Sequence, residues 1–296
     1  MSGTTELIGV DWGSSNLRVM RLGHEGAILE SRSDQRGAAR LTPDEFPIAL
    51  SEVAGNWLRE GIPVVVCGMA GARGKWLETG YCDCPAGLAD LAPVSVGHSE
   101  AVISIVPGVS LSPGGSLIDV MRGEETQVMG LPEIGAADLV VTPGTHSKWI
   151  NLENGLIKDF RTFMTGDLFA AIKAETILGQ DMGDPGVDSG AFEDGVARSL
   201  SDRALTAALF SVRVERLANR MEAASSADYL LGMLIGAEIA GQATPMDRQI
   251  TVIGGPSLNP RYAAALVLAG YENVKTVDGS TASARGLWRI NKAHRP

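Results

Sequence analysis

The stretch from residue 7 to residue 22, LIGVDWGSSNLRVMRL, constrains the fold more than any other part of the chain. Its short apolar run ends in the acid Asp11, and Gly13, Ser14 and Ser15 follow before an apolar pattern resumes. This order predicts a strand, a tight turn and a second strand. The turn presents backbone N–H groups and hydroxyls beside a carboxylate, which is the equipment for holding a phosphate and its Mg²⁺.

The second half of the chain repeats this arrangement. Residues 139–152 read LVVTPGTHSKWINL, and aligning Gly144 with Gly13 places Thr145 beneath Ser14. In both copies a further glycine opens a third short apolar run. A single Gly-Ser or Gly-Thr hairpin is a common structural turn, but the pair with matching third strands indicates two related halves.

The remaining sequence alternates between strand and helix patterns, which predicts mixed sheets with helices on their faces. The predicted strands are 6–11, 16–22, 26–31, 63–67, 102–106, 116–119, 138–142, 147–152, 155–159, 250–255 and 273–277. The predicted helices are 43–60, 123–131, 165–178, 190–200, 204–221, 226–242, one after Asn259, and 280–292. The apolar part of one of them, 229–241, fits either a core helix or the face of a homodimer.

Two such units side by side predict an α/β fold with a central cleft. The segment LPEIGAAD, near residues 132–137, breaks the pattern and marks the expected boundary. The N-terminal domain is then 1–135, with the first phosphate loop and the substrate site. The C-terminal domain is 136–296, with the second phosphate loop and the adenosine loop.

Composition excludes several classes of partner. The chain of 296 residues has 35 acids against 25 Lys and Arg, a net charge of −10, so it lacks the basic footprint of a nucleic-acid or membrane-surface protein. No apolar run approaches the roughly 20 residues that span a bilayer, and no signal-peptide pattern is present. Three cysteines fit a reducing cytoplasm. The spacing of Cys82, Cys84 and His98 is poor for zinc, so structural thiols are the favoured interpretation.

Three loops carry a resemblance to a known superfamily. DWGSSNLR, TPGTHSKW and VIGGPSLN resemble the phosphate and adenosine loops of the actin, hexokinase and Hsp70 superfamily of ATP-dependent kinases and ATPases. More narrowly, GMAGARGKW, GEETQ and PGTHSKW resemble 2-dehydro-3-deoxygalactonokinases, from about residue 7 to residue 290. The resemblance implies two ribonuclease H-like (actin-like ATPase) domains. It also implies transfer of the γ-phosphate of ATP to the 6-hydroxyl of 2-dehydro-3-deoxygalactonate, in galactonate catabolism.

The resemblance of these loops predicts which residues bind ATP and its metal. Phosphate contacts are expected from Gly13, Ser14, Ser15, Arg18, Gly144, Thr145, His146, Ser147 and Lys148, and adenosine contacts from Gly254, Gly255 and Asn259. Asp11 is expected to hold Mg²⁺, with a turn-initiating Asp as the structural alternative. Arg18 faces phosphate or pairs with a surface acid. Lys148 is the natural cation of its loop or is solvated, and His146 is a hydrogen-bond donor rather than a base.

The general base is expected in the segment from Gly123 to Gln127. In related sugar and glycerol kinases an acid lies in a G-D-Q-x-A segment before the second phosphate loop, and GEETQ occupies that place here. By this match Glu124 takes the proton of the sugar hydroxyl. Its rivals are Glu125 and Asp119. The structural alternative is a helix N-terminus, where acids are favoured by the dipole.

The substrate is a sugar acid, so a group must bind its carboxylate, and arginine has a suitable shape. The expected substrate contacts are Asn16, Arg73, Lys75, Trp76 and Arg122, and each cation has the alternative of an ordinary surface role. Two other functions stay open at this point. One is a kinase of another sugar or sugar acid, and the other is a regulatory ATPase without kinase activity. The galacto and gluco epimers are not distinguished by the sequence.

Overall fold

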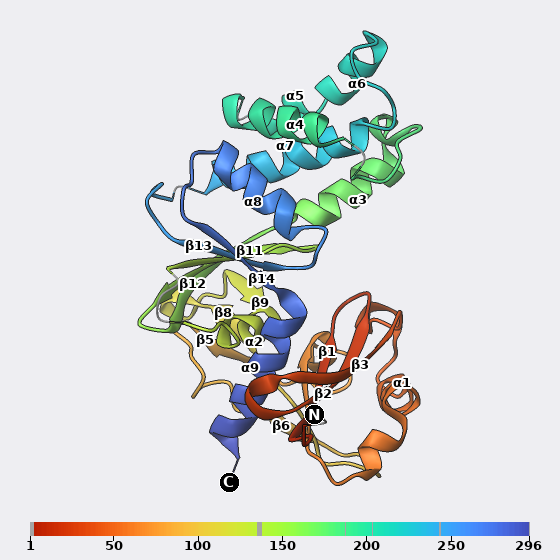
Figure 1. Ribbon diagram of the computed structural model, residues 1–296, viewed down its shortest axis with the longest axis vertical. Coiled ribbons are helices and arrows are strands. Elements are labelled where there is room, and N and C mark those ends of the chain that lie inside the picture. The colour runs from red at the N-terminus through yellow and green to blue at the C-terminus, as the bar shows by residue number, and fades with distance from the viewer. Residues whose placement is uncertain (1–2, 135–137, 187, 203, 243, 296) are drawn as a thin grey trace. The chain divides into compact units, whose positions relative to one another are not determined.

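The computed structural model describes residues 3–134, 138–186, 188–202, 204–242 and 244–295 (Figure 1). The chain divides into two compact units. Unit 1 contains Met1–Val140, Ile150–Arg161 and Val277–Pro296, and unit 2 contains Val141–Trp149 and Thr162–Thr276. The predicted boundary at 135/136 lies outside the described residues and stays a prediction. The C-terminal segment belongs to unit 1, which no local sequence pattern indicated.

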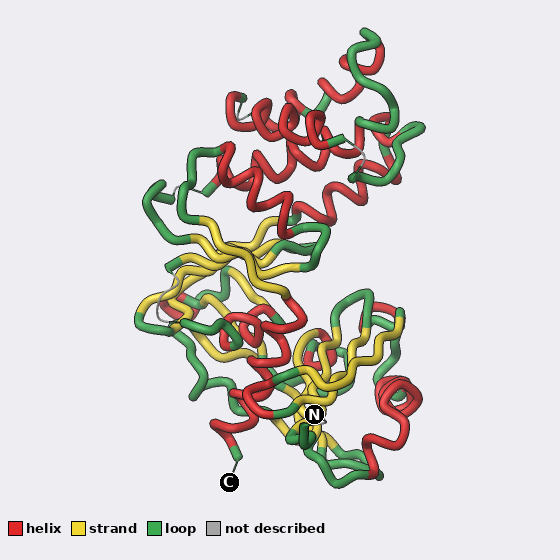
Figure 2. Tube along the Cα trace, viewed as in Figure 1, coloured by secondary structure: helices red, strands yellow, loops and turns green. Residues whose placement is uncertain are grey.

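Unit 1 contains a six-stranded sheet in the order β3-β2-β1-β4-β7-β6 (Figure 2). Its strands are β1 (Leu7–Trp12), β2 (Leu17–Leu22), β3 (Ile28–Asp34), β4 (Val64–Gly68), β6 (Val94–Val96) and β7 (Ile103–Ile105). β1 pairs antiparallel with β2 and parallel with β4. The predicted hairpin is confirmed, because alternating apolar residues bury one face of each strand on both sides of a tight turn. The sequence did not predict β6.

One helix of unit 1 is shorter than the sequence predicted. The expected helix 43–60 is an α-helix, α1 (Glu45–Ala54), followed by a 3-10 helix over Gly55–Arg59. Gly55 has φ +58°, a left-handed conformation that ends the α-helix. The buried side of α1 packs in the core around Trp12 and Phe46, whose ring centroids are 4.8 Å apart.

Beside this sheet, unit 1 contains a small sheet and two packed helices. The strands are β5 (Tyr81–Asp83), β8 (Gly108–Leu111) and β9 (Asp119–Met121), in the order β5-β8-β9. The helices α2 (Glu124–Met129) and α9 (Gly279–His294) pack against each other. A Cβ atom at Gly286 would lie 1.8 Å from the Thr126 carbonyl oxygen, so only glycine permits this crossing. The contact brings the last helix beside the GEETQ segment.

The second large sheet repeats the strand order of the first. It runs β12-β11-β10-β13-β14, and its strands are β10 (Leu139–Thr142), β11 (Ser147–Glu153), β12 (Leu156–Phe163), β13 (Ile250–Gly254) and β14 (Val274–Asp278). As in β3-β2-β1-β4, three consecutive strands stand in reversed order and the next strand of the sheet lies beside the first of them. The predicted repeat is therefore confirmed at the level of strand order.

Helices form most of unit 2 (Figures 1 and 2). They are α3 (Thr165–Glu175), α4 (Ser189–Ser201), α5 (Leu205–Ala208), α6 (Ser211–Leu217), α7 (Ser226–Gly241) and α8 (Asn259–Leu268). The apolar helix α7 packs against α3, α4, α6 and α8, and most of its side chains are buried, so the core interpretation of 229–241 is confirmed. The predicted single helix 204–221 is instead two short helices.

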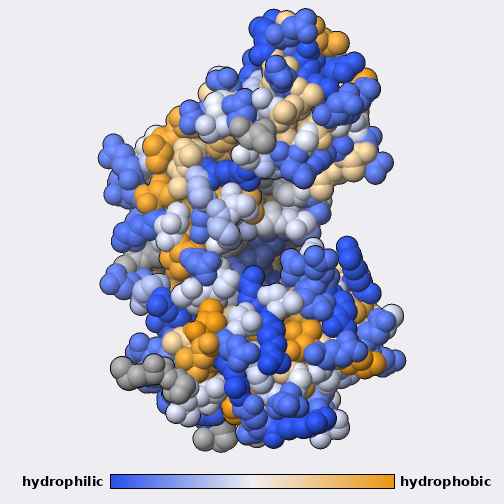
Figure 3. Space-filling model, turned by 45° about the vertical axis from the view of Figure 1, so that its right-hand side comes forward, coloured by the Kyte–Doolittle hydropathy of each residue, from blue (hydrophilic) through white to orange (hydrophobic). Residues whose placement is uncertain are grey.

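The surface agrees with the composition. Figure 3 shows a largely hydrophilic face on which apolar residues form small separate patches. Among the described residues, no helix is long and apolar enough to cross a membrane.

Candidate functional site

In unit 1, two carboxylates come together near the end of β1. Asp11 lies one residue before the end of that strand, and Glu124 opens α2. The Ser283 hydroxyl on α9 donates to Asp11 Oδ2 at 2.9 Å, and Gln127 Nε2 lies 3.4 Å from the Ser283 Oγ. Burial raises the pKa of Asp11, and the charge of Glu124 adds to this, while the Ser283 hydrogen bond and the Arg18 charge oppose it. Asp11 is thus a desolvated acid with a second acid close by.

The turn after β1 is closed by backbone hydrogen bonds and exposes its hydroxyls. Gly13 N donates to the Asn16 carbonyl oxygen at 2.9 Å, and Ser14, Ser15 and Asn16 are exposed. The segment at Gly37 packs directly on this turn. A Cβ atom at Gly37 would lie 2.2 Å from the Ser14 carbonyl oxygen. Sequence reasoning missed Gly37, because only the folded chain brings it to the turn.

Arg18 lies next to Asp11 across the first hairpin. The two residues are register partners of β1 and β2. Arg18 Nη1 donates to the Ser280 hydroxyl on α9 at 2.7 Å. The predicted alternatives for Arg18 were a phosphate and a surface acid. The structure places its guanidinium on a hydroxyl, close enough to Asp11 to favour that carboxylate's charged form.

The three candidate bases have different surroundings. Glu125 is fully buried, and its carboxylate accepts from Gly123 N at 2.7 Å and from the Thr126 hydroxyl at 3.0 Å. Burial, with the Glu124 charge adding, raises the pKa of Glu125 to about 7. Glu124 is partly exposed and accepts from Arg122 N at 3.1 Å. Asp119 lies in the small sheet, where its carboxylate accepts from Val120 N. Of the two adjacent glutamates, Glu124 alone reaches solvent.

The predicted substrate cations differ in how strongly the protein engages them. Arg122 donates to the Thr79 hydroxyl and the Gly80 carbonyl oxygen, each at 2.7 Å, and its guanidinium lies 4.6 Å from the Tyr81 ring centroid. Lys75 donates to the Leu41 carbonyl oxygen at 3.3 Å. Arg122 therefore binds the segment of Thr79 and Gly80 from the turn before α2, and Lys75 ties its own loop to Leu41.

Trp76 and Arg73 differ in burial, because Trp76 is partly buried and Arg73 is exposed. The Trp76 ring is nearly parallel to that of Phe46, with a 6.1 Å centroid separation, and packs against the core. The Arg73 side chain is 89% exposed, and it forms an ion pair at 3.3 Å with Glu78, which is 53% exposed. Arg73 is thus the most accessible cation among the four predicted substrate contacts in and beside this loop.

In unit 2, the turn after β10 lies against the start of α3. Thr145 and His146 are exposed, and the Thr145 carbonyl oxygen accepts from Asp167 N at 3.1 Å. His146 Nε2 lies 2.6 Å from an Asp167 carboxylate oxygen. Lys148 is buried, and its ammonium donates to the His146 carbonyl oxygen at 3.0 Å, so its positive charge lies beneath the turn.

Ser147 differs from the expectation that it contacts phosphate. Its side chain is fully buried, and its hydroxyl lies 2.8 Å from the Tyr262 hydroxyl. Ser147 is the first residue of β11, where the alternation of side chains turns it inward. The groups of this turn that reach solvent are therefore those of Gly144, Thr145 and His146.

The turn after β13 is open on its outer side. Asn259 Nδ2 donates to the Gly254 carbonyl oxygen, and Asn259 N to that of Gly255, both at 3.0 Å. Gly255 is exposed, and no heavy atom of the described residues lies within 4 Å of an added Cβ. A Cβ atom added at Gly254 would lie 3.5 Å from the Pro143 ring. The turn after β13 and the turn after β10 are therefore neighbours in unit 2.

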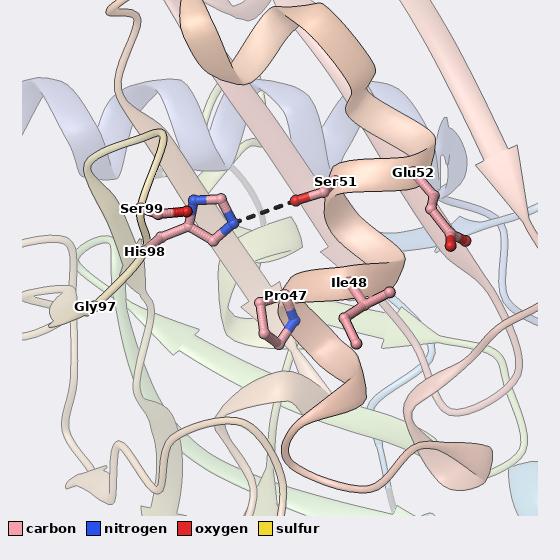
Figure 4. A pocket seen from close by; sticks show the side chains of 7 residues that line it. All are labelled: Pro47, Ile48, Ser51, Glu52, Gly97, His98 and Ser99. Carbon is pink, nitrogen blue, oxygen red and sulfur yellow. Dashed lines mark hydrogen bonds between the residues drawn. The ribbon is translucent and has the colours of Figure 1, made fainter.

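A pocket of about 540 Å³ lies elsewhere in unit 1 (Figure 4). It is lined by Pro47, Ile48, Ser51, Glu52, Gly97, His98 and Ser99. The Ser51 hydroxyl and His98 Nε2 lie 3.4 Å apart, and His98 Nδ1 accepts from Glu100 N, so a backbone amide rather than an acid orients the imidazole. None of the predicted site residues lines this pocket.

The cysteines form no metal centre. In the part of the chain that the structure describes, no group of three or more His, Cys, Asp or Glu is placed to hold a metal ion. Cys82 Sγ instead donates to the Asp90 carbonyl oxygen at 2.9 Å, and Cys67 is buried. The interpretation of these cysteines as structural thiols stays a prediction.

Comparisons with known proteins agree on one family. The family model described as 2-keto-3-deoxy-galactonokinase matches residues 11–290. A 2-dehydro-3-deoxygalactonokinase of Escherichia coli (strain K12) is 35% identical over 294 residues, which cover 98% of this chain and 99% of that protein. A Sinorhizobium meliloti structure, provisionally named as the same kinase, is 36% identical with a TM-score of 0.88, and 98% and 99% of the two chains are covered.

A more distant structure supports the fold alone. The ADPNP-bound activator of 2-hydroxyisocaproyl-CoA dehydratase from Clostridium difficile is 17% identical, with a TM-score of 0.54. The comparison covers 97% of this chain and 95% of that one. The predicted fold class, with mixed sheets flanked by helices as in the actin-like ATPases, is confirmed.

Proposed function

Because the chain belongs to the 2-keto-3-deoxy-galactonokinase family, we propose that it transfers the γ-phosphate of ATP to the 6-hydroxyl of 2-dehydro-3-deoxy-D-galactonate. The observation that carries the proposal within the site is the pair Asp11 and Glu124 beside the exposed Gly-Ser-Ser turn. Phosphoryl transfer requires positioned phosphates, neutralised charge and a group that accepts the hydroxyl proton. Unit 1 has groups suited to each of these requirements.

Glu124 is the proposed general base. It is partly exposed at the start of α2, whereas its neighbour Glu125 is fully buried. A base must come within hydrogen-bond reach of the proton it removes, either directly or through one water. Glu124 can meet a sugar hydroxyl without rearrangement of α2, and Glu125 cannot.

Asp11 is the proposed ligand of Mg²⁺. Mg²⁺ prefers oxygen ligands, takes one or two carboxylates and keeps several waters, so one desolvated carboxylate with a second acid nearby fits it. When bound, the ion neutralises charge on the phosphate oxygens. Ser283 holds one Asp11 oxygen, and the exposed hydroxyls of Ser14 and Ser15 are free to turn toward a phosphate.

The nucleotide is assigned to the two neighbouring turns of unit 2. Backbone N–H groups of Gly144 to His146, with the exposed side chains of Thr145 and His146, suit phosphate oxygens. Lys148 adds positive charge beneath them. Gly255 leaves open space for the ribose and purine, next to Asn259.

The carboxylate of the sugar acid is assigned to Arg73. Its guanidinium is highly exposed and can form a bidentate pair, whereas Arg122 and Lys75 already donate to other groups of the protein. Asn16, exposed at the tip of the first turn, is the proposed contact for a sugar hydroxyl.

A coupled assay of ADP release tests the function. The protein is supplied with ATP and Mg²⁺ together with 2-dehydro-3-deoxy-D-galactonate, its gluco epimer, neutral sugars or no acceptor. We expect turnover that depends on the galacto acid, with a phosphate ester at the 6-position in the phosphorus NMR spectrum. Preference for another sugar supports the first alternative, and hydrolysis of ATP without sugar stimulation supports the regulatory ATPase. A cytoplasmic location and a homodimer stay predictions, which fractionation and light scattering test.

A further inference from the structure

A buried carboxylate in unit 2 collects hydrogen bonds from three other elements. Glu238 on α7 is only 2% exposed. Its Oε1 accepts from Trp149 Nε1 at 2.7 Å, and its Oε2 accepts from the Tyr262 hydroxyl at 2.9 Å. The Thr165 hydroxyl also donates to Oε2. These donors come from β11, α8 and α3, so one carboxylate joins a strand and two helices to the central helix.

Each donor lies close to a turn that the proposed function assigns to the nucleotide. Thr165 opens α3, whose first turn contacts the Gly144–His146 turn through Asp167. Trp149 follows that turn by three residues along β11. Tyr262 lies in the first turn of α8, which begins at Asn259. The network therefore contacts the elements on both sides of the phosphate turn, through Thr165 and Trp149. It contacts the helix that follows the adenosine turn through Tyr262.

The Tyr262 hydroxyl extends the network to Ser147. A phenol has a single proton, and Tyr262 donates it to Glu238, so Ser147 is the donor in the 2.8 Å contact between the two hydroxyls. Ser147 directly follows His146 in the phosphate turn. The chain of bonds from Ser147 through Tyr262 to Glu238 thus sets the distance between the end of that turn and the start of α8.

The energetic cost of this arrangement indicates that the network fixes the positions of its members rather than adding stability. A buried carboxylate is costly unless it is well hydrogen-bonded, and burial raises the pKa of Glu238 in spite of its donors. Packed apolar side chains fill a core at less cost, whereas a satisfied polar network fixes one arrangement of its members. Kinase catalysis depends on such fixed positions, because misplacement by about 1 Å can cost on the order of 100-fold in rate.

We propose that Glu238 is a positioning residue that fixes the phosphate turn and the adenosine turn of unit 2 relative to each other. It touches neither turn's exposed groups and acts through Ser147, Thr165 and Tyr262. This inference rests on the proposed assignment of the two turns to ATP. It adds a residue that has no place in the predicted loops and lies near the C-terminal end of α7, 92 positions after His146.

The same helix offers a matched control. Asp228 is also 2% exposed, near the other end of α7. Its carboxylate accepts from Gly186 N at 2.7 Å and from Asp188 N at 3.0 Å. Those amides lie in the connection before α4, and Asp228 Oδ1 also forms an ion pair with the Arg261 guanidinium of α8 at 3.7 Å. Replacing Asp228 therefore disturbs a buried acid of α7 without cutting the network of Glu238.

The test measures the Kd of ATP by titration calorimetry for Glu238→Gln, Tyr262→Phe and Asp228→Asn, with the KM of each substrate and the Tm. Glu238→Gln keeps the shape but places an amide donor against existing donors. We expect its Kd for ATP to rise about tenfold, as a loss of roughly 1.4 kcal/mol implies, while the KM of the sugar acid changes less than twofold. Tyr262→Phe should raise the Kd by about fivefold, because it removes the hydrogen bond to Glu238 and the one from Ser147.

Asp228→Asn should lower the Tm and leave the Kd of ATP unchanged. An unchanged Kd in Glu238→Gln, with a loss of Tm like that of Asp228→Asn, overturns the inference and leaves Glu238 with a structural role. Should Glu238→Gln fail to fold, an unchanged Kd in Tyr262→Phe overturns it equally. Failure of the proposed function is seen separately, because the wild-type protein would then bind ATP without phosphorylating the sugar acid, or would not bind ATP.

Discussion

The turn after β1 and the turn after β10 each place a glycine before a hydroxyl residue, yet their acids lie in different places. The first turn has Asp11 and the partly exposed Glu124 beside it. The second has an exposed histidine paired with the partly exposed Asp167, and a buried lysine, while the further acid Glu238 is buried in the core behind it. In the proposed function, the first turn therefore lies beside the groups assigned to proton and metal chemistry, and the second turn beside groups assigned to anion binding alone.

The difference shows what a repeated scaffold does and does not determine. The orders β3-β2-β1-β4 and β12-β11-β10-β13 place a turn at the equivalent point of each sheet. The groups around each turn come from helices outside the repeated strands. These helices are α2 and α9 in unit 1 and α3, α7 and α8 in unit 2. Function is set by the residues grafted on the scaffold.

The contrast is tested most strongly by Glu124→Gln. The amide cannot accept the sugar proton, so kcat should fall by about 1,000-fold, within the range for general-base catalysis. The Kd of ATP should stay within twofold, because Glu124 is assigned to the sugar hydroxyl and not to the nucleotide. Steady-state kinetics and calorimetry measure both values. Asp119→Asn is the comparison variant, and near-normal turnover in Glu124→Gln would move the base to Asp119 or Glu125.

The two units also each bury a carboxyl, and Glu125 permits a pH test in unit 1. Its folded pKa of about 7 lies above the ordinary value of 4.5, so the unfolded chain ionises first as the pH rises. Wild-type stability should thus fall between about pH 4.5 and pH 7, relative to Glu125→Gln, by about 3 kcal/mol, and the difference should be constant above that range. Urea unfolding of both proteins at several pH values measures it, and parallel curves would refute the burial argument.

Local chemistry explains which parts were predictable. Both hairpins and the start of α2 follow from alternation and from glycine at turns, which act over a few residues. The strands β5, β6 and β7 have only three residues each, and of these the sequence indicated only β7. Gly55, whose left-handed backbone ends α1, shows how a single residue can interrupt an otherwise helical pattern.

The supporting residues of the site could not be found in this way. Ser283 is 272 positions from Asp11, and Glu238 is 89 positions from Trp149. No periodicity links residues so far apart, and only the tertiary structure pairs them. The choice between Glu124 and Glu125 depends on the rotation of α2, because adjacent helical residues point about 100° apart. That rotation is set by packing against α9.

The support of the first turn is tested by Gly37→Ala. The added Cβ would lie 2.2 Å from the Ser14 carbonyl oxygen, so the turn or the Gly37 segment must move. We expect a loss of about 2 kcal/mol in the free energy of unfolding, in the range found for overpacked sites. Chemical denaturation measures the loss. Gly74→Ala is a poor control because its φ is +71°, whereas Gly97, with open space around it, is a suitable one. Equal stability of the two variants would contradict the close packing.

The mildest test compares the glycines of the two turns themselves. Within the described residues, an added Cβ meets nothing within 4 Å at Gly144 and only the Asn16 carbonyl oxygen, at 3.6 Å, at Gly13. Neither position requires glycine for folding, so Gly13→Ala and Gly144→Ala should keep the wild-type Tm. If the turns hold phosphate, the methyl group obstructs the anion's approach, and the KM of ATP should rise about tenfold, a cost of about 1.4 kcal/mol. An unchanged KM in Gly144→Ala alone would remove the phosphate from unit 2 and leave the first turn as its sole candidate.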